Sequence, residues 1–339
     1  MSATRRTFVA GTLATSAAVA LPARRSHAAE EIKLHSFVPP THVIWTDVIT
    51  PWTQEVARLS NNQLTVRLFP AMQLGGKPPE LYRQTVQGIT DATFTLPGYT
   101  SNDFPMMALT ELPGTATSAE DGTRKLWTHF EKFLTREFKD TKVLMLWNSD
   151  SASLMSKSKP LRTLEDLRGM KIRTPSAAQS SQIEALGATP IDMPANQIYN
   201  NLDRGVIDAS MIPMSAALDF KLIEVAQYYT VDAPLGRSPF LVAMNRGRYE
   251  KLPAELRKIL DDTTGLSLSL KGAATYDKKN HDAIEAAKKG KQVIPLAAQE
   301  RQRWQAAFRP MIQKKIEEGE KAGLPARDLV NAYGLLSAT

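Results

Sequence analysis

The spacing of hydrophobic residues switches repeatedly between two periods along the first third of the chain. Residues 32–37 and 64–69 alternate apolar and polar side chains with a period of two, which is typical of half-buried strands. Residues 42–60 and 80–87 instead place apolar side chains at helical spacing, and residues 89–95 return to the strand pattern. Strands that alternate with helices in this order predict a parallel sheet covered by helices.

The same alternation restarts in the middle of the chain and predicts a second unit. Strand patterns cover residues 143–147, 170–173, 189–191 and 206–211, and helical patterns cover residues 177–186 and 197–203. We therefore predict two α/β lobes, with residues 148–153 as the segment that crosses between them. A later strand pattern at residues 240–245 is predicted to return to the first lobe.

Helical patterns dominate the C-terminal third. One long helix is predicted from Pro253 to about Lys289, because proline is favoured in the first turn of a helix. Gly265 and Gly272 weaken this helix but need not end it. A helix of this length exceeds the globular average several-fold, so we expect it to run across both lobes.

These patterns predict how the chain divides into lobes. Lobe I comprises residues 29–150 and 239–278, and lobe II comprises residues 151–238 and 279–339. Within lobe II, the last part holds a strand at residues 292–295. The predicted fold class is α/β, with two lobes and one long helix that spans both.

The N-terminus carries the pattern of an export signal. Arg5 and Arg6 precede a moderately apolar run at residues 8–21, and residues 26–28 place small side chains at the two positions that a signal peptidase reads. The two adjacent arginines also resemble a twin-arginine signal. We therefore predict that residues 1–28 are a cleaved signal peptide of the twin-arginine type, which places the mature protein in the periplasm.

Removal of this segment changes the charge of the chain. The full chain has a formal charge of +7, and residues 1–28 contain four arginines and no acid, so the mature chain carries +3. A charge so close to neutral does not favour a nucleic-acid partner. No later segment has 18 or more consecutive apolar residues, so we expect a soluble mature protein. The absence of cysteine excludes disulfides, thiolate catalysis and zinc sites with sulfur ligands.

The common motifs of enzymes are missing. The sequence contains no HExxH, GxSxG or GxxxxGK(S/T) pattern, and the four histidines of the mature chain have no metal-ligand spacing. We therefore expect no enzymatic activity, no cofactor and no metal. His35 shares one face of its strand with Lys33 and Phe37, so its side chain is a candidate for lining a cleft.

Five ordered segments carry a resemblance to a known family. They are residues 68–76 (LFPAMQLGG), 88–94 (GITDATF), 164–175 (LEDLRGMKIRTP), 185–190 (ALGATP) and 198–208 (IYNNLDRGVID). Their order and spacing are similar to those of the solute-binding subunits of tripartite ATP-independent periplasmic (TRAP) transporters, over essentially the whole mature chain. The resemblance implies a two-lobed periplasmic binding protein fold with a ligand cleft between the lobes. It also implies a monomer that delivers a small organic acid to membrane permease subunits.

The resemblance assigns the binding of the ligand carboxylate to Arg173, in the segment 171–175. A planar guanidinium offers two parallel N–H donors that match the two oxygens of a carboxylate. In a closed cleft, each charge-assisted hydrogen bond of this kind contributes about 1.5–3 kcal/mol.

Four departures from the sialic-acid-binding relatives suggest a less polar ligand. Where those relatives have polar side chains, this chain has Ser153, Ile212, Leu96 and Phe37. Sugar hydroxyls that lose their hydrogen bonds against apolar side chains cost about 1–3 kcal/mol each. An aromatic or aliphatic ligand instead gains about 25 cal/mol per Å² of apolar area buried. The predicted ligand is therefore an aromatic or apolar monocarboxylate.

Aromatic residues are candidates for the wall of the cleft. Trp147 is favoured, because it ends a strand that faces the crossing between the lobes. The other candidates are Phe37, Trp45, Phe94, Tyr99 and Tyr199. Some relatives hold their ligand through a metal, with an acid and a tryptophan after a Val-Asp pair. This chain has Ala-Ser-Met-Ile at residues 209–212, which supports the prediction that no metal is bound.

Three alternatives stay open at the level of the sequence. Arg237 directly precedes the returning strand and could replace the missing second cation, which would admit a dicarboxylate or a sugar acid. The protein could instead present its ligand to a membrane sensor. The third alternative is a periplasmic enzyme built on the same scaffold.

Overall fold

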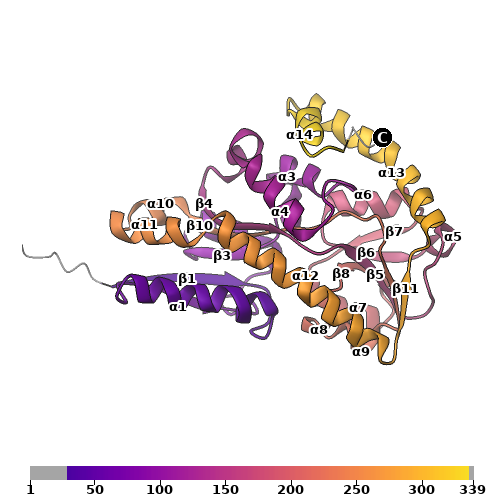
Figure 1. The fold of residues 1–339 in the computed structure, drawn as a ribbon, viewed down its shortest axis with the longest axis horizontal. Coiled ribbons are helices and arrows are strands. Elements are labelled where there is room, and N and C mark those ends of the chain that lie inside the picture. The colour runs from indigo at the N-terminus through magenta and orange to yellow at the C-terminus, as the bar shows by residue number, and fades with distance from the viewer. Residues whose placement is uncertain (1–28, 336–339) are drawn as a thin grey trace, which may run out of the picture.

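The computed structural model describes residues 29–335, which form two sheets with helices packed around them (Figure 1). This arrangement confirms the predicted two-lobed α/β fold class. The predicted signal peptide, residues 1–28, lies outside the described residues. Between residues 29 and 335, no helix combines the length and the apolar character that crossing a bilayer requires.

The first sheet has five strands in the order β2-β1-β3-β10-β4. Their bounds are Glu30–Ser36 (β1), Leu64–Phe69 (β2), Ala92–Thr95 (β3), Thr141–Asn148 (β4) and Pro239–Asn245 (β10). Strand β1 pairs parallel with β2 and β3, whereas β10 pairs antiparallel with β3 and β4. The late strand therefore returns to the first lobe, as its pattern predicted.

The second sheet has six strands in the order β11-β9-β5-β8-β6-β7. Their bounds are Ala152–Ser156 (β5), Lys171–Thr174 (β6), Thr189–Asp192 (β7), Ala209–Pro213 (β8), Tyr228–Val231 (β9) and Gln292–Pro295 (β11). Strand β6 pairs parallel with β7 and β8, and β9 pairs parallel with β11. Strand β5 is antiparallel to both of its neighbours.

Each sheet thus contains one reversed strand, which is the strand that enters from the other lobe. Strand β4 leaves the first sheet at Asn148, and β5 begins at Ala152; β9 ends at Val231, and β10 begins at Pro239. The predicted parallel pairing is confirmed for β1, β2 and β3, whereas the antiparallel direction of β5 and β10 was not predicted. The predicted crossing at residues 148–153 is too long, since its last two residues belong to β5.

Helices of the first lobe cover its sheet. Their bounds are Thr50–Leu59 (α1), Leu81–Val86 (α2), Pro105–Thr110 (α3) and Ala119–Thr128 (α4). One π-helical turn, Trp45–Ile49, leads into α1, which buries Trp52 and Val56 and contacts β2. The first turn of α4 is capped by Ser118, whose hydroxyl accepts a hydrogen bond from the Asp121 amide.

Helices of the second lobe are shorter. Their bounds are Leu164–Leu167 (α5), Ala177–Ala185 (α6), Ile198–Asp203 (α7), Ala216–Asp219 (α8) and Leu222–Val225 (α9). Helix α6 follows β6 after two residues, and its N-cap is Ser176, whose hydroxyl accepts a hydrogen bond from the Gln179 amide. This short connection places the end of β6 beside the first turn of α6.

The long C-terminal helix is divided in two. After α10 (Arg246–Glu250), α11 spans Ala254–Thr263 and α12 spans Leu266–Lys288. The prediction of one continuous helix is wrong, because Gly265 adopts a φ of +79°, which ends helical hydrogen bonding. Helix α12, without α11, is long enough to cross both lobes, since it contacts β4 in the first sheet and β11 in the second (Figure 1). Gly272 lies inside α12 where a Cβ would stand 3.2 Å from the Trp147 ring, so the helix packs directly on this indole.

Two further helices complete the chain. Helix α13 spans Ala298–Lys321, and α14 spans Ala326–Ala332. Helix α13 contacts α5 and α6 of the second lobe and α3 of the first, and α14 also contacts α3 (Figure 1). The C-terminal helices therefore connect both lobes on the side away from α12. The residue-by-residue division into lobes stays a prediction.

Candidate functional site

A narrow cavity lies between the two sheets. Residues of both lobes line it. The first lobe and α12 contribute Phe37, His42, Leu96, Tyr99, Phe240 and Tyr276. The second lobe and the crossing segment before β10 contribute Arg173, Pro175, Ala195, Ile212, Pro213, Ser215, Ala216, Phe220 and Ser238. A ligand in this cavity would touch both lobes at once.

Arg173 is the charged residue at the base of the cavity. It lies on β6 opposite Ser210 of β8, and its side chain is only 2% exposed. Its Nε–H donates to the Met193 carbonyl (2.8 Å), and Nη1 donates to the Met211 carbonyl (3.1 Å). These two bonds fix the plane of the guanidinium. The remaining N–H groups lie on Nη1 and Nη2, and the neighbouring Tyr99 hydroxyl accepts a hydrogen bond from this guanidinium.

No carboxylate among residues 29–335 lies within ion-pair distance of this guanidinium. Burial lowers the pKa of Arg173, and the charge of the solvent-exposed Asp192 only partly opposes this. A buried charge without a close counterion is costly, because the protein interior solvates it poorly. An anion that entered the cavity would remove this cost, so the surroundings of Arg173 favour an anionic ligand.

Tyr99 adds a second hydrogen-bond donor at the same end. Its hydroxyl accepts a hydrogen bond from the Ala195 amide (3.0 Å) and lies close enough to Arg173 for its charge interaction to raise the pKa of that guanidinium. A phenol that accepts one bond still has its own proton to donate. Arg173 and Tyr99 therefore present donors from opposite lobes to one small acceptor group.

Aromatic rings form the walls. Phe37 of the first lobe and Phe220 of the second stack with 6.4 Å between ring centroids and 11° between planes. Both also line an outer groove that holds Tyr199, so this ring pair separates the cavity from the groove. On the inner side, Phe240 stacks on Tyr276 at 5.0 Å and 18°. Flat apolar walls of this kind fit an aromatic ring.

Ser215 is held at the wall by a buried acid. Its hydroxyl donates to Asp150 Oδ1 (2.5 Å), and its amide donates to Oδ2 (3.2 Å). Burial raises the pKa of Asp150 to about 7, although the Ser215 bonds and the charge of Arg237 act in the opposite direction. Asp150 lies in the short crossing between β4 and β5, so this interaction connects the crossing to the cavity.

Five of the residues predicted from the sequence line the cavity. They are Arg173, Phe37, Leu96, Tyr99 and Ile212. Two others lie in the core behind the lining. Trp147 is fully buried and stacks on Phe240, while Ser153 pairs with Ile212 across β5 and β8. Trp147 therefore supports the wall from behind rather than forming it.

Three predicted residues, His35, Tyr199 and Arg237, lie away from the lining. The His35 ring contacts Gln84 at Nδ1 (3.2 Å) and accepts from the Leu74 amide at Nε2 (3.3 Å). Tyr199 stands in the outer groove, where its hydroxyl donates to Glu224 (3.2 Å).

Arg237 binds the crossing segments instead of the cavity. Its Nη1 donates to the Ser149 carbonyl (3.0 Å), and Nη2 donates to the Thr117 carbonyl (3.0 Å). The Ser149 amide in turn donates to the Ser238 carbonyl (2.9 Å). Arg237 thus holds the two crossings together. Its predicted use as a second ligand cation receives no support from this geometry.

Several lining residues were not selected by sequence reasoning. They are His42, Ser215, Phe220, Ser238, Phe240 and Tyr276. Phe240 belongs to a strand that the sequence predicted, but the pattern of this strand does not indicate which of its faces meets the cleft. Tyr276 follows the helical spacing of α12, so its sequence signal is that of a core residue. Only the packing of α12 across both lobes brings it to the cavity.

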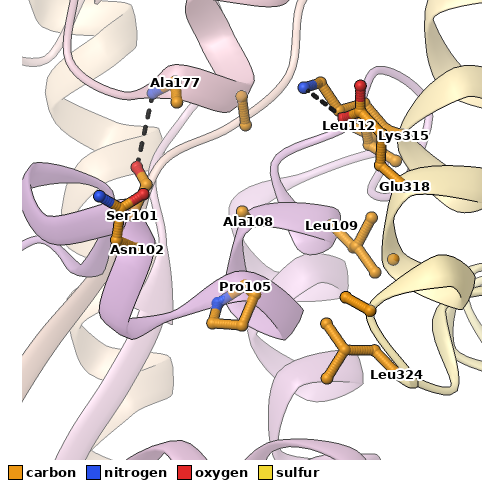
Figure 2. A pocket seen from close by; sticks show the side chains of 13 residues that line it. Ser101, Asn102, Pro105, Ala108, Leu109, Leu112, Ala177, Lys315, Glu318 and Leu324 are labelled. Carbon is orange, nitrogen blue, oxygen red and sulfur yellow. Dashed lines mark hydrogen bonds and ion pairs between the residues drawn. The ribbon is translucent and has the colours of Figure 1, made fainter.

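A second hollow lies on the outer surface between α3 and α13 (Figure 2). Its wall includes Pro105, Leu109 and Leu324, and its charged residues, Lys315 and Glu318, form an ion pair with each other at 2.9 Å. It thus lacks the uncompensated buried charge of the inner cavity. Within residues 29–335, no group of three His, Asp or Glu side chains is placed to hold a metal ion, and the prediction that none is bound stays a prediction.

Comparison with known proteins agrees with this architecture. Residues 34–318 match the family described as bacterial extracellular solute-binding protein, family 7. A TRAP solute-binding protein from an unidentified marine microbe, specific for aromatic acid ligands and crystallised with 3-hydroxybenzoate, is 32% identical with a TM-score of 0.88. The similarity covers 92% of this chain and 99% of that one.

Two further relatives widen the comparison. A TRAP solute-binding protein from Rhodoferax ferrireducens T118, in complex with copurified benzoate, is 30% identical with a TM-score of 0.87, over 91% of this chain and 98% of that one. The 2,3-diketo-L-gulonate-binding periplasmic protein of Escherichia coli K12 is 27% identical over 59% of this chain and 62% of its own length. Together with the two-lobed fold and the cleft, these matches show that the chain belongs to the family 7 bacterial extracellular solute-binding proteins, the solute-binding subunits of TRAP transporters.

Proposed function

We propose that the chain is a periplasmic receptor that binds an aromatic monocarboxylate and delivers it, chemically unchanged, to the membrane subunits of a TRAP transporter. The observation that carries this proposal is the state of Arg173. Its guanidinium is buried at the base of an aromatic-walled cavity, with N–H groups available and no carboxylate of the described residues within ion-pair distance.

The ligand carboxylate supplies the counterion that Arg173 lacks. A guanidinium held in one plane by Met193 and Met211 is preorganised, so little side-chain entropy is lost when the ligand binds. Tyr99 donates a further hydrogen bond to the same carboxylate. Because Tyr99 belongs to the first lobe and Arg173 to the second, a shared carboxylate favours the closed arrangement of the two lobes.

The apolar body of the ligand fits the walls. Burying about 100 Å² of aromatic surface against Phe37, Leu96 and Ile212 contributes about 2.5 kcal/mol. A sugar acid in the same place would set its hydroxyls against these side chains, at a cost of about 1–3 kcal/mol for each unpaired group. The walls therefore select against a polyhydroxylated ligand.

The relatives support the same class of ligand. The two similar TRAP proteins of known structure hold 3-hydroxybenzoate and benzoate. The diketogulonate-binding relative represents the sugar-acid alternative, but its similarity is lower and covers less of the chain. The dicarboxylate alternative required Arg237 as a second cation, but its guanidinium binds the backbone carbonyls of Ser149 and Thr117.

Isothermal titration calorimetry with matched ligands tests the proposal. Benzoate is expected to bind, whereas benzamide, which has nearly the same shape but no charge, is expected to show no heat of binding. Succinate and glucuronate serve as the dicarboxylate and sugar-acid probes. A response confined to either of them would reject the aromatic monocarboxylate.

The remaining parts of the proposal have direct checks. Benzoate incubated with the protein should be recovered unchanged by chromatography, since we propose a receptor and not an enzyme. Mass spectrometry of the periplasmic protein should place its first residue at position 29, and light scattering should give the mass of a monomer. Genes for two membrane subunits beside this one would favour transport over a role in presenting ligand to a sensor.

A further inference from the structure

One buried polar group of the cavity has no partner in the protein. Tyr276 on α12 is 2% exposed, and its hydroxyl makes no hydrogen bond within residues 29–335. Among the buried polar side-chain atoms of the described residues that lack a partner, this hydroxyl is the one that belongs to a residue of the cavity lining. A buried hydroxyl without a partner destabilises a protein, so a ligand is the natural source of its hydrogen bond.

The ring of Tyr276 is fixed by its neighbours. It stacks on Phe240 at 5.0 Å between centroids, and Trp147 lies behind it at 6.2 Å. His42 meets its edge at 6.1 Å. A ring held on three sides by buried aromatic residues cannot swing its hydroxyl out to water. The hydroxyl therefore stays at the wall, in a position set by the fold.

The charges around this hydroxyl differ from those around Arg173. Burial raises the pKa of Tyr276, and the negative charges of Asp219 and Asp150 raise it further, so the group is a neutral phenol. Asp219 has a partial counterion in Lys279 (3.6 Å). His42 adds no positive charge, since burial lowers its pKa to about 3. Among the described residues, this end of the cavity thus offers no unpaired cation to hold a second carboxylate.

We propose that Tyr276 hydrogen-bonds a hydroxyl substituent on the ring of the bound aromatic acid, so that the receptor prefers hydroxybenzoates to benzoate. The proposal rests on the function proposed above and extends it. Arg173 and Tyr99 hold the carboxylate at one end of the ligand, and Tyr276 recognises an uncharged polar group elsewhere on its ring. A phenolic hydroxyl suits Tyr276, because each of the two groups can act as donor or acceptor.

Calorimetry with a ligand series tests this inference. The series is benzoate, its three hydroxy isomers, and the 3- and 4-methyl isomers, which match a hydroxyl in size but form no hydrogen bond. At least one hydroxy isomer is expected to bind the wild-type protein about tenfold more tightly than benzoate, whereas the methyl isomers should show no such gain. Methyl isomers that bind as tightly as the best hydroxy isomer would overturn the inference, because shape alone would then explain the preference.

The variant Tyr276→Phe is the matched change on the protein side. Measured against benzoate on the same variant, the preferred hydroxybenzoate should lose its tenfold gain in affinity. Retention of that gain in Tyr276→Phe would also overturn the inference. The ligand series on the wild-type protein decides the question even if this variant does not fold. Benzoate that binds without any hydroxyl gain rejects only the role of Tyr276, whereas absence of binding by every aromatic acid rejects the proposed function as well.

Discussion

Arg173 of β6 and Arg237 of the crossing before β10 both lie near the cleft, yet their guanidinium groups have different partners. Arg237 is half-buried, donates to carbonyls of Ser149 and Thr117, and lies near the charges of Asp150, Asp277 and Asp121. Arg173 is almost fully buried, donates to two carbonyls and has no acid at ion-pair distance among the described residues.

The difference teaches how to separate a structural arginine from a ligand-binding one. Both side chains bond backbone carbonyls, so hydrogen bonds to the protein do not distinguish them. The surroundings do, because Arg237 has several acids to balance its charge while Arg173 has only the solvent-exposed Asp192. We therefore assign ligand binding to the arginine whose charge the protein leaves largely uncompensated.

The largest effect is expected from Arg173→Ala. Loss of two charge-assisted hydrogen bonds, at about 1.5–3 kcal/mol each, should weaken benzoate binding at least 100-fold in calorimetry. Arg173→Lys keeps the charge but not the planar pair of donors, so its affinity should lie between those of Arg173→Ala and wild type. Wild-type affinity in Arg173→Ala would remove the basis of the proposed function.

Arg237→Met should affect stability and not binding. The change removes hydrogen bonds to two carbonyls at about 1 kcal/mol each, so the free energy of unfolding in urea should fall by about 2 kcal/mol. The benzoate dissociation constant should stay within about threefold of wild type. The reverse pattern, unchanged stability with a dissociation constant raised tenfold or more, would return Arg237 to the ligand site.

Leu96→Asn tests the apolar wall of the cavity. A polar amide set against the ring of the ligand should weaken benzoate binding about tenfold, corresponding to about 1.4 kcal/mol. Leu96→Met is the matched control, since it keeps a similar apolar volume and should have little effect. Equal affinities in the two variants would show that Leu96 does not contact the ligand.

A last prediction concerns the pH dependence of stability. Burial raises the pKa of Asp150 from 3.8 to about 7, so the folded state holds a proton that the unfolded state releases between these values. The contribution of Asp150 to stability is therefore greatest below pH 4 and is lost as the pH rises toward 7. Melting temperatures from pH 5 to 8 should fall less steeply in Asp150→Asn, whose amide can replace the protonated carboxyl beside Ser215. An unchanged slope would mean that Asp150 does not titrate in this range.

The sequence predicted the fold through periodicity, and it failed where one residue overrides a pattern. Strands β1 and β2 follow clear alternation, β10 is a continuous apolar run, and all three lie where their patterns indicated. The break between α11 and α12 was missed, because helical spacing continues through Gly265 while its backbone turns to positive φ. The reversed strand β5 was missed because a short, fully buried strand shows no alternation.

The cavity was predicted only in part, for a related reason. Leu96, Ile212 and Phe37 were found because they replace polar residues of relatives, which marks them as positions near a ligand. Phe220 and Tyr276 carry no such mark, since an aromatic residue in a helix or loop is usually a core residue. Their place in the cavity depends on how α12 and the two lobes pack, and that packing is not encoded in any local pattern.

A crystal structure of the mature protein with bound benzoate tests the central claim most directly. The proposal predicts that the carboxylate lies between Arg173 and Tyr99, with one oxygen about 2.7–2.9 Å from a terminal guanidinium nitrogen. The ring should lie against Phe37 and Leu96. A carboxylate bound at Arg237 or in the outer groove, with Arg173 touching only protein, would contradict the account.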